Sequence, residues 1–62
     1  MEFNKIYLVK DSSHLGLVYK VEFKPSKEYE DLVIVKDYLY NDTYYMAWEE
    51  IEEEFQILGL AN

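Results

Sequence analysis

Apolar residues recur at every second position from Leu15 to Phe23, with Lys20 and Glu22 between the last three of them, and this alternation is the strongest structural signal in the chain. The apolar positions are Leu15, Leu17, Tyr19, Val21 and Phe23. A period of two is typical of a β-strand with one buried face. The stretch ends at Pro25, which has no N–H to donate to a neighbouring strand. We therefore expect a half-buried strand here.

Two shorter stretches also have the composition of strands. Ile6–Val9 is β-branched and aromatic, and it ends at the turn-forming residues that begin with Asp11. Leu32–Val35 is apolar on both faces, as expected for a central strand. We found no repeat or linker, and a chain of 62 residues suffices for only one small core. We expect residues 1–62 to form a single domain.

Residues 44–58 are open to two interpretations. Apolar residues recur at helical spacing, namely Trp48, Ile51, Phe55 and Leu58. This spacing predicts a helix over 44–58, packed on a three-stranded antiparallel sheet in an α+β fold. Alternatively, Tyr44–Trp48 is a fourth strand, Glu49–Glu54 a helical turn and Phe55–Leu58 a short fifth strand, in a mainly β fold.

A resemblance favours the mainly β fold. It rests on Gly16-Leu17-Val18-Tyr19-Lys20-Val21, Leu32-Val33-Ile34-Val35-Lys36-Asp37, Tyr44-Tyr45, and Glu50-Ile51 followed by Phe55. Over roughly 15–58 the chain resembles small SH3-like barrel proteins, many of them encoded by phages and mobile elements of Gram-positive bacteria. The resemblance implies a five-stranded barrel with a helical turn near 49–54, and a binding role rather than a reaction.

We expect one hydrophobic core, because the alternating positions, the central strand and the C-terminal apolar residues form no second cluster. The predicted core residues are Leu17, Tyr19, Val21, Val33, Val35, Trp48 and Phe55.

The negative charge is concentrated in the C-terminal part of the chain. Residues 1–36 hold all six lysines and six acids, whereas residues 37–62 hold seven acids and no base, so the net charge of −7 arises there. Such a surface disfavours direct binding to nucleic acids and to anionic membranes. The chain has no cysteine and no signal-peptide pattern, so we expect a cytoplasmic protein.

Neither catalysis nor metal binding is expected. Asp11-Ser12-Ser13-His14 places an acid, hydroxyls and the single histidine side by side, but consecutive residues point in different directions and a triad must converge. The glutamate run lacks the glycine and the spacing of a calcium loop. A transition metal would need more imidazole or thiolate than His14 offers. We therefore expect no cofactor and no enzyme.

We predict instead a surface for a basic protein partner. Five closely spaced carboxylates can stand in for phosphates, and tyrosine is frequent at interfaces. The predicted contact residues are Asp37, Tyr38, Tyr40, Asp42, Tyr44, Tyr45, Glu49, Glu50, Glu52, Glu53 and Glu54. The hypothesis is an inhibitor that covers the nucleic-acid site of a host or defence protein. The alternative is a structural or accessory subunit, such as a homodimer, that uses tyrosines and sheet edges while the acids are only solvated.

Overall fold

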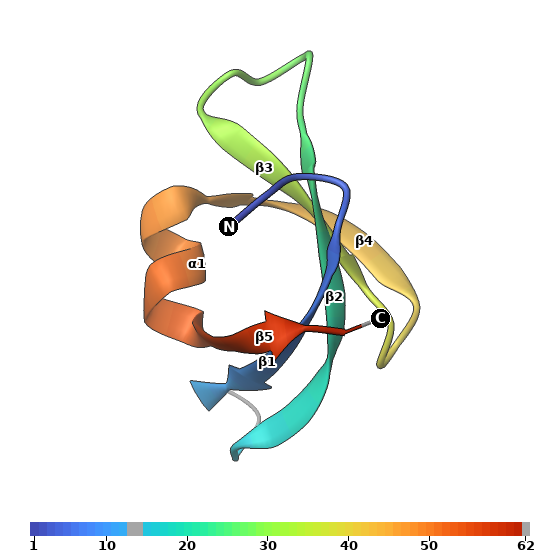
Figure 1. Ribbon diagram of the computed structural model, residues 1–62. Coiled ribbons are helices and arrows are strands. Elements are labelled where there is room, and N and C mark those ends of the chain that lie inside the picture. The colour runs from blue at the N-terminus through green and yellow to red at the C-terminus, as the bar shows by residue number, and fades with distance from the viewer. Residues whose placement is uncertain (13–14, 62) are drawn as a thin grey trace.

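The computed structural model describes residues 1–12 and 15–61 of the chain (Figure 1). Ser13 and His14, which belong to the predicted polar turn, lie outside the described residues. The described residues form five strands and one helix: β1 (Ile6–Asp11), β2 (Leu17–Pro25), β3 (Leu32–Asp37), β4 (Asp42–Ala47), α1 (Trp48–Glu54) and β5 (Phe55–Leu60).

All five strands belong to one antiparallel sheet with the order β4-β3-β2-β1-β5. The predicted half-buried strand is β2, and the apolar central stretch is β3, which pairs with both β2 and β4. Figure 1 shows the sheet twisted and curved, with α1 on its open side between the two edge strands. The mainly β prediction is therefore confirmed in its strand content and its short helix.

The predicted helix over 44–58 is wrong, because strand pairing overrides the helical spacing at both of its ends. Asp42–Ala47 pairs residue by residue with β3, and Phe55–Leu60 pairs with β1. Only the seven residues of α1 remain helical, and the backbone is already extended at Phe55. Among the residues described, no helix is long and apolar enough to cross a membrane.

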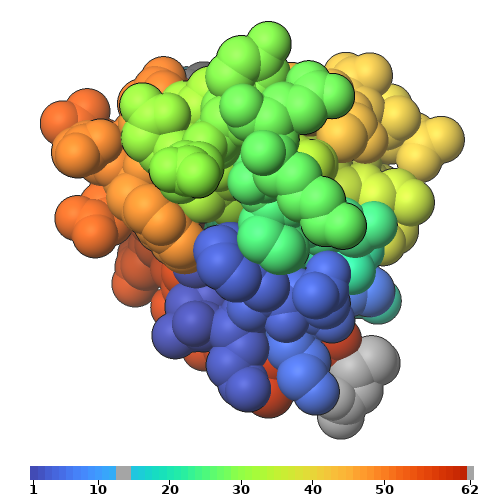
Figure 2. All heavy atoms as spheres, turned by 90° about the horizontal axis from the view of Figure 1, so that it is seen from above, coloured from blue at the N-terminus to red at the C-terminus, as the bar shows by residue number. Residues whose placement is uncertain are grey.

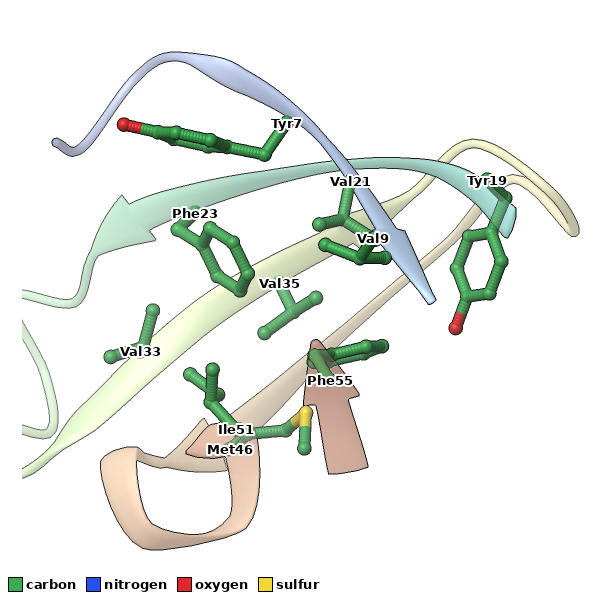
Figure 3. Packing of buried hydrophobic residues seen from close by; sticks show 10 residues of the cluster. All are labelled: Tyr7, Val9, Tyr19, Val21, Phe23, Val33, Val35, Met46, Ile51 and Phe55. Atoms are coloured by element: carbon green, nitrogen blue, oxygen red, sulfur yellow. The ribbon is translucent and has the colours of Figure 1, made fainter. Parts of the chain in front are cut away.

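A single hydrophobic core lies between the concave face of the sheet and α1 (Figure 3). Its members come from every strand and from the helix: Tyr7, Val9, Tyr19, Val21, Phe23, Val33, Val35, Met46, Ile51 and Phe55. Ile51 is the buried residue of α1, so the helix covers the core through one side chain. The strand register places core residues of neighbouring strands opposite one another, for example Phe23 of β2 and Val35 of β3.

Five of the seven predicted core residues are buried, and the prediction is wrong for Leu17 and Trp48. Leu17 is the first residue of β2 and pairs with the last residue of β1. It lies at the end of the sheet and is 48% exposed. Trp48 is the first residue of α1, is 39% exposed and packs against Phe3, with 5.9 Å between ring centroids. Met46 and Ile51 are the buried side chains on either side of it in sequence.

Candidate functional site

The five glutamates of α1 gather on one short helix. Glu49, Glu50, Glu52 and Glu53 are exposed, and Glu54 is half-buried. We call this set the acidic helix. Ala47, just before the helix, is its N-cap residue, and its own side chain cannot cap the helix. The Glu50 carboxylate instead accepts a hydrogen bond from the Ala47 N–H at 3.0 Å. Acids in the first turn also interact favourably with the helix dipole. Glu50 therefore has a structural role as well as a charge.

The negative charge of the acidic helix is not balanced by nearby positive charge among the described residues. Glu49 and Glu53 lie four residues apart, as do Glu50 and Glu54, and like charges at this spacing destabilise a helix by about 0.2–0.5 kcal/mol per pair. The last turn carries no base. Within the described part of the chain, no lysine lies within ion-pair distance of these carboxylates. The acids are thus present despite a cost in helix stability.

The structure does not bring the predicted tyrosines of the β3–β4 turn to the acidic helix. Tyr38 and Tyr40 lie in that turn, and the extended strand β4 runs between the turn and α1. Figures 1 and 2 both show the turn and the helix on opposite sides of the molecule. Asp42, at the start of β4, stays with the turn. The Tyr38 hydroxyl donates a hydrogen bond to Glu22 Oε1 at 2.9 Å, which raises the Tyr38 pKa.

Asp37 lies in the interior of the protein, although it was predicted as a contact residue. It is 4% exposed. Its Oδ1 accepts hydrogen bonds from the backbone N–H groups of Leu39, at 2.6 Å, and Tyr40, at 3.3 Å. A carboxylate that binds the backbone two residues on is an Asx turn. Asp37 therefore shapes the β3–β4 turn, and we leave it out of the candidate surface.

Tyr44 and Tyr45 point to opposite faces of β4. Tyr45 is exposed and meets Tyr29 edge-on, with 5.2 Å between ring centroids. Tyr44 is half-buried against the core. Burial, followed by the nearby carboxylates of Asp37 and Asp11, raises the Tyr44 pKa to about 12. Of the two, Tyr45 is the exposed residue, and it points to the face of β4 opposite the core.

A buried pair that we did not predict lies at the same end of the core as Tyr44. Asp11 is 2% exposed, and its Oδ2 accepts a hydrogen bond from the Tyr19 hydroxyl. Burial first, then this hydrogen bond, raises the Tyr19 pKa. We had placed Asp11 in a turn. The signal that identifies it is the period of two in β1, since Tyr7, Val9 and Asp11 share one face of the strand.

Removal of the Tyr44 hydroxyl should change the stability of the protein in alkali. Unfolded tyrosine ionises near pH 10, whereas folded Tyr44 keeps its proton to about pH 12. The folded state binds more protons in this window, so the free energy of unfolding falls as pH rises through it. We expect Tyr44→Phe to weaken this fall, as measured by urea unfolding between about pH 9 and pH 12. Tyr45→Phe, on the exposed face, is the control, and equal slopes in both variants would contradict the prediction.

An apolar hollow lies beside the acidic helix, where the N-terminal segment, α1 and β5 meet. Its volume is about 320 Å³, and it is lined by Met1, Trp48, Ile51, Glu52, Phe55 and Ile57. We call it the apolar hollow. Sequence reasoning missed it, although helical spacing already placed Trp48, Ile51 and Phe55 on one face. The core predicted from the sequence includes Trp48 and Phe55 of that face and does not include Ile51.

Hydrogen bonds donated by backbone N–H groups hold the N-terminal segment over this region. The Asn4 N–H donates to the Phe23 carbonyl at 2.8 Å, and the Glu2 N–H donates to the Tyr7 hydroxyl at 2.7 Å. Asn4 has a φ of 62°, a left-handed conformation that asparagine adopts more readily than most residues. Figure 2 shows the dark blue N-terminal residues beside the orange residues of α1.

A second, more polar hollow lies on the other side of the helix end. It has a volume of about 210 Å³ and is lined by Lys10, Ser12, Glu52, Glu53, Glu54, Phe55 and Gln56. The Ser12 hydroxyl donates to the backbone carbonyls of Glu53 and Glu54 at 3.4 and 3.3 Å, which satisfies carbonyls at the end of α1. Glu52 and Phe55 line both hollows, so the two are adjacent.

The described residues include no group of three or more acidic, histidine or cysteine side chains arranged to hold a metal ion. Comparison with protein-family models, curated proteins and solved structures found no match for the chain. The candidate site is therefore the acidic helix and the apolar hollow beside it, and its function must be argued from their chemistry.

Proposed function

We propose that this chain is a non-catalytic, SH3-like interaction protein that docks its acidic helix on a basic surface of a protein partner. The observation that carries the proposal is five glutamates on a seven-residue helix, four of them exposed and none within ion-pair distance of a described lysine. The SH3-like assignment is supported by α1 between β4 and β5, with Phe55 passing from the helix into the last strand and the core.

The partner we propose is a nucleic-acid-binding protein of a host or of a defence system, which this chain would inhibit in the cytoplasm. A surface that binds phosphates is basic, and closely spaced carboxylates complement it in charge. The carboxylates of Glu49, Glu52 and Glu53 are exposed and make no hydrogen bond within the described part of the chain. Their charge is thus free to interact with lysine and arginine on another protein.

Affinity capture with matched baits tests this function. The helix variant carries Glu49→Gln, Glu52→Gln and Glu53→Gln, and it spares Glu50, which caps the helix. The control variant carries Glu28→Gln, Glu30→Gln and Asp31→Asn in the exposed β2–β3 connection. Both lose three negative charges. We expect the wild-type and control baits to capture the same basic protein, and the helix variant to lose it.

Two further properties of the captured protein bear on the mechanism. Salt of about 1 M, where the Debye length is about 3 Å, should release it. Duplex DNA or RNA should compete with this chain for it, because both would occupy the same basic surface. A partner that the helix variant captures as well as the wild type does would exclude the acidic helix as the docking surface.

A second candidate is a structural subunit that assembles through a sheet edge, and the observation in its favour is β5. This edge strand exposes Ile57, Leu58 and Leu60, at 39%, 48% and 57%. Exposed apolar edge strands are sites of pairing between chains. In the same capture experiment, this function predicts a partner, or further copies of the chain, held equally by all three baits and retained in high salt.

A further inference from the structure

We infer that the apolar hollow receives a bulky apolar side chain of the basic partner, so that the partner binds as an amphipathic basic segment and not through charge alone. This inference rests on the proposed function and makes its partner more specific. The floor of the hollow is Ile51 and Phe55, which are almost fully buried, and its walls include Trp48 and Ile57, each 39% exposed. An apolar side chain placed there would remove exposed apolar surface on both molecules from water.

The charge around the hollow restricts what can occupy it. Glu52 lines the hollow, and Glu49 and Glu53 are exposed on the same seven-residue helix. An anionic ligand or membrane would be repelled by these carboxylates. A second copy of the chain would meet the same obstacle, because a two-fold interface places the same patch on both subunits and would bring glutamates to face glutamates. The complementary occupant is cationic beside its apolar group.

The arrangement of the two hollows favours a polypeptide over a small apolar cation. The apolar hollow and the polar hollow lie on either side of Glu52, and Glu53, Glu54 and Gln56 line the polar one. A small molecule would fill one hollow, whereas a segment of chain can cross the helix end and use both. An apolar anchor would then enter beside Trp48 while lysines or arginines meet the glutamates. This is the pattern of an anchor residue surrounded by polar contacts at an interface.

Two synthetic peptides of equal charge test this inference on the full chain. One contains lysine and leucine, the other contains lysine with serine at every leucine position, and neither contains tryptophan. Trp48 is the only tryptophan of the protein, so its fluorescence reports on the hollow directly. We expect the leucine peptide to bind more tightly, by about 10- to 100-fold for one fully buried side chain. We expect it alone to shift the Trp48 emission to shorter wavelength.

Two variants separate this inference from the proposed function. Ile57→Ser removes an apolar wall of the hollow on an edge strand and keeps every charge, and its fold is checked by circular dichroism. It should lower the affinity for the leucine peptide about tenfold or more, toward that for the serine peptide. The Glu49→Gln, Glu52→Gln and Glu53→Gln variant should weaken both peptides, on the order of tenfold, because it removes charge and leaves the wall intact.

The possible outcomes are distinct. If the glutamine variant weakens both peptides but Ile57→Ser weakens neither, the hollow is not an anchor site and the proposed function still stands. If the glutamine variant weakens neither, the proposed function fails, whatever Ile57→Ser does. If Ile57→Ser changes the sedimentation of the protein without peptide, Ile57 lies in a contact between copies of the chain, through the hollow or through the β5 edge, and the inference is overturned.

Discussion

Phe23→Ala should remove a large part of the stability of the protein. Phe23 is fully buried at the middle of the core, where its ring lies 6.1 Å from that of Tyr7 and 6.3 Å from that of Phe55, centroid to centroid. Truncation of a buried phenylalanine costs about 3–5 kcal/mol. A chain of 62 residues has a total stability of about 3–9 kcal/mol. The loss therefore amounts to about a third or more of the total stability. Urea unfolding followed by Trp48 fluorescence or circular dichroism measures it.

Leu17→Ala is the matched control for Phe23→Ala, because both residues lie on the same alternating positions of β2. Leu17 is 48% exposed at the end of the strand, so its truncation should cost less than about 1 kcal/mol. Comparison of the two variants shows whether the loss of stability depends on burial of the side chain or only on its position in the alternating pattern. Equal losses in the two variants would mean that the core extends to the end of β2, contrary to the observed packing.

Asp37→Ala should destabilise the protein by about 2–3 kcal/mol, since it removes a buried charged acceptor from two backbone N–H groups. The β3–β4 turn depends on this acceptor, because the Leu39 and Tyr40 N–H groups both donate to its Oδ1. The turn also places Asn41 at a φ of 59°, a conformation that needs local support in residues other than glycine. Chemical denaturation of the variant gives the free energy directly.

Asp37→Asn distinguishes a structural carboxylate from one that binds a partner. Asparagine keeps an acceptor oxygen at the same position, so we expect it to restore stability to within about 1 kcal/mol of the wild type. It should also leave partner binding unchanged, because the residue is buried. A stable Asp37→Asn protein with impaired binding would return Asp37 to the contact surface.

Strand positions could be predicted from the sequence because a period of two is a local property. Tyr19 and Val21 were predicted as core residues from it and are buried, and Phe23, on the same face but not among the predicted core residues, is buried as well. The same pattern failed at Leu17, since periodicity identifies the face of a strand but not how far along the strand the core extends. At Trp48 the helical spacing identified the correct face, but a helix of seven residues leaves its first residue at the margin.

The candidate site was harder to predict because it depends on distances between elements. Asp42 and Glu49 are close in sequence, and a helix would separate them by only about 10 Å. In the structure β4 is an extended strand, with a rise of about 3.3 Å per residue. It therefore keeps the β3–β4 turn, which holds Tyr38 and Tyr40, away from the acidic helix. The burial of Asp11 and Asp37 likewise depends on partners from elsewhere, the Tyr19 hydroxyl and two turn amides, which no local pattern of charge reveals.

The glutamates of α1 were predicted as a group, and four of the five are exposed, which makes them the most direct subject for a functional test. Their mutual repulsion and the absence of lysine partners among the described residues set them apart from Glu22, which lies near Lys24 at 4.0 Å. A surface under no demand other than solubility would more often mix both signs of charge. A helix that carries these glutamates despite the loss of helix stability from their repulsion is consistent with a partner of opposite charge.

The rate of association with the captured basic protein tests the central claim most directly. It should be measured at rising salt for the wild type, for the helix variant with glutamine at 49, 52 and 53, and for the matched β2–β3 variant. Electrostatic steering raises association rates by about 10- to 1,000-fold and depends on ionic strength. The account predicts a fast, salt-sensitive rate for the wild type and the matched variant, and a slow rate with little salt dependence for the helix variant. Equal rates and equal salt dependence in all three proteins would contradict it.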